Sequence, residues 1–227
     1  MSEAYKKLFW GVFFANIHVH IGAITLLPAF VGFLIAYSGL SDLDMKTETA
    51  AKSFDLPQGT LLALVILTAI YSAFNLFTGS QYETLPLVSF IPTVFSVMEL
   101  VAFHKILEVS VTEFQARDFT YGVEKYSRRD RVYILLKGTS ILFLTVQFIF
   151  NSPVILVAGT LIEVAAIIYL LVIFHSLKKD TEEMENLKKS EFYKKLKETD
   201  GIGIIEVYRG ASQTKFENGK LFLEGEE

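Results

Sequence analysis

The chain has no cysteine among its 227 residues. Disulfides, thiolate catalysis, Cys-ligated zinc and iron–sulfur clusters are therefore excluded. A basic stripe is also missing, because Lys and Glu are interleaved and the net charge is only -4, which argues against nucleic acid as a partner. Neither a G-x-S-x-G nor an H-E-x-x-H motif is present. We expect no cofactor, and the sequence favours a function other than catalysis.

Hydrophobic residues, by contrast, make up 52% of the chain and include 20 Phe. A soluble domain of this size could not hide so much apolar surface in one core. The apolar runs end near Leu177, and the residues that follow are dense in Lys and Glu. The sequence therefore predicts a helical membrane domain over 1–177 and a cytoplasmic helix with a small β-unit over 178–227.

Apolar stretches of transmembrane length, about 20 residues, recur along the chain. The predicted spans are 58–78, 86–107, 132–150 and 153–175. Aromatic and basic residues are mixed between the second and third spans, which predicts an amphipathic connector on the membrane surface over 108–130. Asn151 and Ser152 leave room only for a tight hairpin between the last two spans.

The first apolar stretch, residues 8–40, is too long for one upright span. Its middle is polar and is followed by Pro28, which breaks or kinks a helix. The polar residues there are Asn16, His18 and His20. We expect a re-entrant hairpin of two half-length helices with its tip near residues 18–27, although a fifth span stays open. The fold class is thus an all-α membrane bundle, with four transmembrane helices plus an N-terminal re-entrant helical hairpin, or five spans.

The C-terminal part predicts a small mixed unit. Lys and Glu recur at helical spacing over 178–197, residues 202–208 favour a strand, and Asn218-Gly219 is typical of a type I′ hairpin turn. So few residues bury only a marginal core. We therefore expect this unit to rest on the membrane domain, a membrane or cytoplasmic protein partner, or a second copy of the chain.

The distribution of basic residues predicts the orientation. The turns at 79–85 and 151–152 contain none of the 21 Lys and Arg residues. Because Lys and Arg favour the cytoplasmic side, a re-entrant first stretch would put both termini in the cytoplasm, beneath the cytoplasmic membrane. If that stretch crosses the bilayer instead, the N-terminus lies outside, and Lys6 and Lys7 are the only basic residues that are not cytoplasmic.

The N-terminus carries a recurrent pattern: Phe9-Trp10-Gly11, an apolar run, Pro28-x-Phe30-x-Gly32, and Gly39-Leu40. It resembles the opening of a large group of small, uncharacterised bacterial multi-pass membrane proteins. The resemblance covers roughly the first forty residues and implies no activity. In many such sequences an acidic residue follows the proline, where Ala29 stands here.

Glu99 and Glu163 lie well inside apolar spans, where an ionisable group costs about 2.5–3.5 kcal/mol on insertion. They could line a proton or cation path, or they could be protonated or paired acids that lock helices together. Lys137 and His104 lie near predicted span ends, where we expect Lys137 to snorkel to the headgroups.

His18 and His20 are weak candidates for a metal site that Glu99 or His104 would complete. Two residues apart, they share a side only in extended backbone, and hydrogen-bonded tip histidines are the simpler interpretation. Arg128, Arg129 and Arg131 could bind anionic lipid headgroups or only fix the orientation.

Three functional hypotheses follow. The favoured one is a non-catalytic membrane module that acts through self-association or a partner. The alternative is a small ion, proton or solute conductor that uses the intramembrane acids. The third is a membrane-embedded enzyme acting on a lipid-like substrate.

Overall fold

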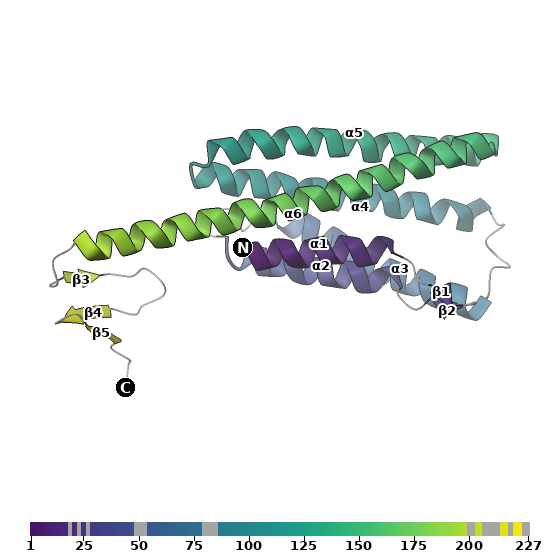
Figure 1. Cartoon of the computed structure of the whole chain (residues 1–227). Helices are drawn as coiled ribbons and strands as arrows, with labels where there is room; N and C mark the ends of the chain where they lie inside the picture. The colour runs from purple at the N-terminus through teal and green to yellow at the C-terminus, as the bar shows by residue number, and fades with distance from the viewer. Residues whose placement is uncertain are drawn as a thin grey trace. The chain divides into compact units, whose positions relative to one another are not determined.

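The computed structural model describes residues 1–17, 20–21, 24–25, 28–47, 54–78, 86–198, 203–205, 214–217 and 220–223. Helices dominate these residues (Figure 1). They are α1 (Ser2–Asn16), α2 (Ala29–Asp44), α3 (Asp55–Thr78), α4 (Pro86–Ala116), α5 (Thr120–Phe150) and α6 (Pro153–Glu198). The chain divides into two compact units, Met1–Thr181 and Glu182–Glu227.

Four helices, α3 to α6, are long and apolar enough to cross a membrane. Large apolar side chains on them point outward, among them Phe77, Phe150, Val154 and Leu161. Such surfaces are costly in water, whereas the hydrocarbon of a bilayer accepts them. The protein is therefore a membrane-embedded, multi-pass helical protein, as predicted.

Prolines mark where the helices begin. Pro86 and Pro153 are the first residues of α4 and α6, Pro57 lies in the first turn of α3, and Pro28 directly precedes α2. These positions suit proline because the first-turn N–H groups have no partner within the helix. Asn151 ends α5 in the left-handed conformation with φ 46, and the predicted tight hairpin to α6 is confirmed.

The predicted surface connector over 108–130 is wrong. Residues up to Ala116 continue α4 and residues from Thr120 begin α5, so that only 117–119 separate the two helices. Asp118 turns the chain with φ 57, and the Phe119 N–H donates to the Phe114 carbonyl at 2.9 Å. The mixture of aromatic and basic residues equally suits two neighbouring helix ends that project beyond the hydrocarbon, since 31 residues of helix span about 46 Å.

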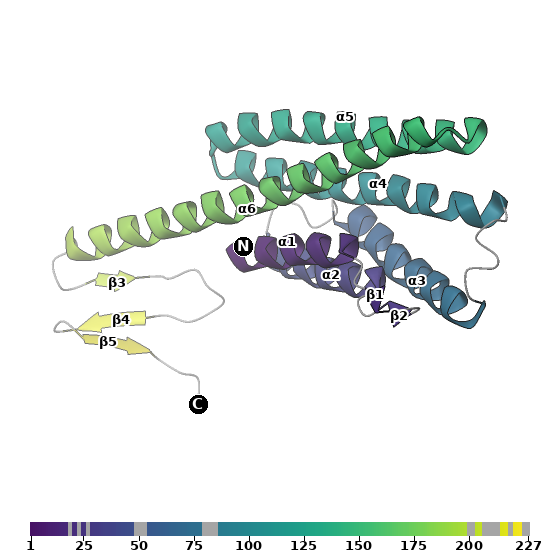
Figure 2. The same ribbon diagram turned by 45° about the vertical axis from the view of Figure 1, so that its right-hand side comes forward.

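Helices α1 and α2 form a packed pair that is too short to span (Figures 1 and 2). Their 15 and 16 residues extend about 23 Å, below the hydrocarbon thickness of about 30 Å. Between them, β1 (His20–Ile21) pairs antiparallel with β2 (Ile24–Thr25). The first apolar stretch is therefore two half-length helices, and not one continuous span.

Small residues bring the backbones of α1 and α2 together. A Cβ atom added to Gly32 would lie 2.1 Å from the Ala15 nitrogen, and one added to Gly11 would lie 2.5 Å from the Ala36 nitrogen. Neither space admits a methyl group, so this contact needs glycine on each helix. Gly11, Gly32 and Gly39 are also the glycines of the N-terminal sequence pattern, which gives that pattern a packing role.

Helix α6 continues without a break into the second unit, so the charged segment 178–197 extends the last apolar helix. The described strands there are β3 (Gly203–Ile205), β4 (Thr214–Glu217) and β5 (Lys220–Leu223). They pair antiparallel in the order β3-β4-β5, and Glu217 pairs with Lys220. The predicted type I′ turn at residues 218–219 lies outside the described residues.

Candidate functional site

A buried ion-pair cluster joins α4, α5 and α6. Lys137 of α5 has a side chain only 2% exposed, and its Nζ donates to Glu99 Oε2 of α4 at 2.7 Å. The same Nζ donates to Glu163 Oε1 of α6. The side chains of Glu99 and Glu163 are 14% and 18% exposed. One ammonium group therefore ties three helices together.

This geometry corrects the prediction that Lys137 snorkels to the headgroups. The expectation treated the lysine alone, whereas two acids stand at a similar depth on neighbouring helices. Lys137 lies about 20 Å of helix from the end of α5, and Glu99 lies about 20 Å from the start of α4. A comparison of how far each charged residue lies from the end of its helix could have predicted from the sequence that the three residues meet.

The cluster is not electrically balanced. With every group ionised, one lysine and two glutamates leave a net charge of one negative unit. Among the described residues, Glu163 Oε2 is buried and has no hydrogen-bond partner, while Lys137 donates to the other oxygen. A buried carboxylate oxygen without a donor is costly, which distinguishes this cluster from a fully satisfied ion pair.

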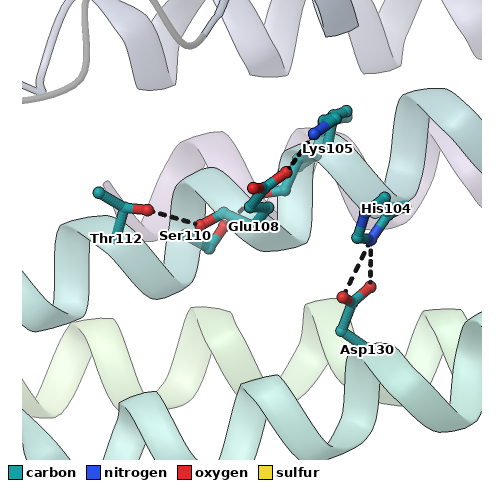
Figure 3. Close-up of polar contacts among 7 residues, drawn as sticks. His104, Lys105, Glu108, Ser110, Thr112 and Asp130 are labelled. Carbon is teal, nitrogen blue, oxygen red and sulfur yellow. Dashed lines mark hydrogen bonds and ion pairs between the residues drawn. The ribbon is translucent and has the colours of Figure 1, made fainter.

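A second polar contact joins α4 to α5 (Figure 3). The Nδ1 atom of His104 lies 3.1 Å and 2.9 Å from the two carboxylate oxygens of Asp130, whose side chain is largely buried. Nearby on α4, Lys105 pairs with Glu108 at 2.5 Å on the exposed side. His104 is thus held within the helix contact, and its partner was missed in the sequence.

Tyr133 connects these two groups along α5. It is one helical turn from Lys137 and about one turn from Asp130, and it is fully buried. Glu99, Glu163 and Asp130 all act on its hydroxyl electrostatically. Polar groups therefore follow one another along the contact between α4, α5 and α6.

A third contact lies closer to the 117–119 turn. Lys125 Nζ donates to Asp180 Oδ2 at 2.6 Å, and the Tyr126 hydroxyl donates to the same oxygen at 2.7 Å. The hydroxyl is also 3.1 Å from Ser176 Oγ. These bonds join the start of α5 to α6, so that each of the three contacts spans two or more helices.

The predicted headgroup residues separate into two kinds. Arg128 and Arg131 are exposed, which suits contact with lipid or water. Arg129 is half-buried, and its guanidinium lies 5.6 Å from the centre of the Tyr126 ring. That stacking gives Arg129 a packing role through a cation–π contact. Binding of anionic headgroups by the three residues stays a prediction.

The N-terminal candidates have local roles or lie outside the described side chains. Asn16 Nδ2 donates to the Val12 carbonyl at 2.9 Å within α1, so this bond is made inside its own helix. The side chains of His18 and His20 are outside the described residues, so their metal site stays a prediction. In the part of the chain that is described, no group of three or more His, Asp or Glu residues could hold a metal ion.

The sequence places Tyr5 in an aromatic belt at the membrane interface, but the structure buries it between α1 and side chains of α4. Its side chain is fully buried near Ser110, Glu113 and Arg117. Arg117 Nη2 pairs with Glu113 Oε1 at 2.5 Å. Burial raises the pKa of the Tyr5 hydroxyl well above its ordinary value, and the Glu113 carboxylate acts in the same direction. The N-terminal pair therefore rests on a polar part of α4.

Chemically, the cluster around Lys137 can do two things: it can hold helices together, and its acids can exchange protons. Both actions use the same three side chains, Glu99, Lys137 and Glu163. No known protein family matches the chain, and no curated protein or solved structure shows significant similarity to it.

Proposed function

We propose that the protein is a non-catalytic module of the cytoplasmic membrane that acts through association, using its C-terminal segment as the contact. The observation that carries this proposal is the continuity of α6. One helix of 46 residues begins in the apolar bundle and extends into the charged segment, a length of about 69 Å. Such a helix physically links the membrane part to the β-unit that follows it.

The small size of the β-unit favours association. Its described strands contain three or four residues each. Sheets of this size gain too little buried apolar area to be stable alone, and they usually pack against another surface. We propose that a second copy of the chain or another protein supplies that surface.

We further propose that both termini are cytoplasmic and that α1 and α2 form a re-entrant hairpin. The basic residues of the 117–131 region mark the end of the α4–α5 pair where these helices join. The sequence segments 79–85, before α4, and 151–152, after α5, contain no Lys or Arg. Tyr5 near the N-terminus lies close to Arg117 at the basic end. This proximity supports an N-terminus on the same side as the basic residues.

Size measurement in detergent tests the association. The full chain should run as an oligomer or carry a partner from the host membrane, and a variant truncated after Glu198 should run as a monomer. A matched control with Lys220→Ala and Lys215→Ala keeps the length of the tail and should still associate. A monomeric full chain without a partner, or an unchanged complex after truncation, would contradict the proposal.

A second candidate, proton or ion conduction, is favoured by the succession of polar contacts along α4, α5 and α6. Protein in liposomes loaded with a pH-sensitive dye should then dissipate a proton gradient. The flux should fall in Glu99→Gln and Glu163→Gln and persist in Glu108→Gln, whose acid is exposed. A wild-type protein that moves neither protons nor monovalent ions would remove this candidate.

A further inference from the structure

The buried cluster of α4, α5 and α6 contains two carboxylates and one ammonium group, so one negative charge is uncompensated when all three groups are ionised. We propose that Glu99, Lys137 and Glu163 form a proton-binding site that holds one proton on its paired carboxyl groups. The site goes beyond association, and it can hold a proton without conducting it. Failure of this inference is therefore distinguishable from failure of either proposed function.

The charges of the cluster balance only when it binds one proton. Among the contacts of the described residues, Lys137 is the cation that reaches both carboxylates. One negative charge remains, and a net charge is strongly disfavoured in a low-dielectric interior. A single added proton makes the cluster neutral while Lys137 stays charged and keeps both of its hydrogen bonds.

The two oxygens of Glu163 differ in their contacts. Among the described residues, Glu163 Oε2 is buried without a donor, while Glu163 Oε1 accepts from Lys137. An ionised carboxylate would leave negative charge on an oxygen with no donor nearby. A protonated carboxyl group removes that charge, so the geometry places the added proton on this side of the cluster.

Within the described part of the chain, the titratable groups around the cluster do not supply a second positive charge. From α4, His104 is bonded to Asp130 of α5, so that any charge it gains is offset there. From α5, Tyr133 is a neutral phenol at ordinary pH. From α6, Glu163 itself is the acid that faces Lys137. A proton therefore remains the way to balance the cluster.

The same geometry selects a proton over a metal ion. The Lys137 ammonium group occupies the space between the two carboxylates, where a bridging cation would have to sit. Hard cations such as Ca²⁺ need about six or more oxygen ligands, whereas the two carboxylates have four oxygens and Lys137 already binds two of them. The ligand chemistry that fits is therefore H⁺.

Infrared difference spectroscopy of the full chain in lipid nanodiscs tests this site, because protonated and ionised carboxyl groups absorb separately. At neutral pH the wild type should show a protonated carboxyl band. That band should disappear in both Glu99→Gln and Glu163→Gln, since the remaining carboxylate then forms a neutral pair with Lys137. In Lys137→Met it should double, because both acids must then be protonated.

Controls separate this site from other acids. Glu108→Gln should keep the band, because Glu108 is exposed and pairs with Lys105. Circular dichroism of each variant establishes that the helices persist, and the Glu→Gln changes keep the side-chain shape. Absence of a protonated band from folded wild type would overturn the inference. A band that survives both Glu99→Gln and Glu163→Gln would overturn it as well.

Discussion

The two halves of the first unit are held together by opposite means. Between α1 and α2, glycines allow backbones to touch, and a Cβ at Gly32 would come within 2.1 Å of Ala15. Between α4, α5 and α6, long charged side chains meet in the interior, with Lys137 at the centre. Close backbone packing needs no ionisable group, so the charges in the second region are candidates for function as well as for stability.

The largest expected effect comes from removing the shared cation. Lys137→Ala leaves two acids without their partner, and breaking a buried ion pair in this way costs about 3–5 kcal/mol. The midpoint of thermal unfolding in detergent should fall strongly. Lys105→Ala removes a cation from an exposed pair on α4 and should change the midpoint little. If both variants lowered the unfolding midpoint equally, the buried ion pairs of Lys137 would stabilise the protein no more than the exposed pair of Lys105.

An alanine substitution at Gly32 tests the close packing of α1 against α2. Gly32→Ala should destabilise the protein by about 1–3 kcal/mol, because the new Cβ meets the backbone of α1. Gly138→Ala is the matched control, since a Cβ there meets nothing within 4 Å and alanine favours helix. Thermal unfolding of the two variants should therefore shift in opposite directions. A harmless Gly32→Ala would mean that α1 and α2 are not in backbone contact.

A smaller effect is expected at the third polar contact. Tyr126→Phe removes the hydroxyl that donates to Asp180 and should cost about 1 kcal/mol, a typical value for one hydrogen bond. Tyr121→Phe is the control, because that residue is 69% exposed. If both variants unfold at the same temperature as the wild type, this contact adds no stability to the α5–α6 pairing.

The sequence predicted most of the helical architecture because apolar runs of membrane length are a strong signal. It also predicted where the first stretch breaks, since Pro28 follows a polar middle. The partners of Glu99 and Glu163 were missed because Lys137 was judged by its distance from a span end. Two charged residues on different helices pair only if they lie at the same depth in the membrane and on helix faces that point toward each other. A single sequence gives the depth approximately and does not give the facing sides. The connector was misjudged because helix ends and surface helices share the same composition.

Tyr5 of α1 is buried near side chains of α4, and the pH dependence of unfolding can measure the contribution of this contact. Burial raises the pKa of its hydroxyl in the folded protein above the ordinary value of about 10. Above that pH the unfolded chain releases the proton and the folded chain does not, so the contribution of Tyr5 is fully present below about pH 10 and is lost as the pH rises. Unfolding midpoints measured at neutral and alkaline pH should fall less in Tyr5→Phe than in the wild type. Tyr121→Phe, which changes an exposed phenol, should retain the wild-type slope. An unaltered slope in Tyr5→Phe would mean that the phenol is accessible to water and that α1 does not bury it against α4.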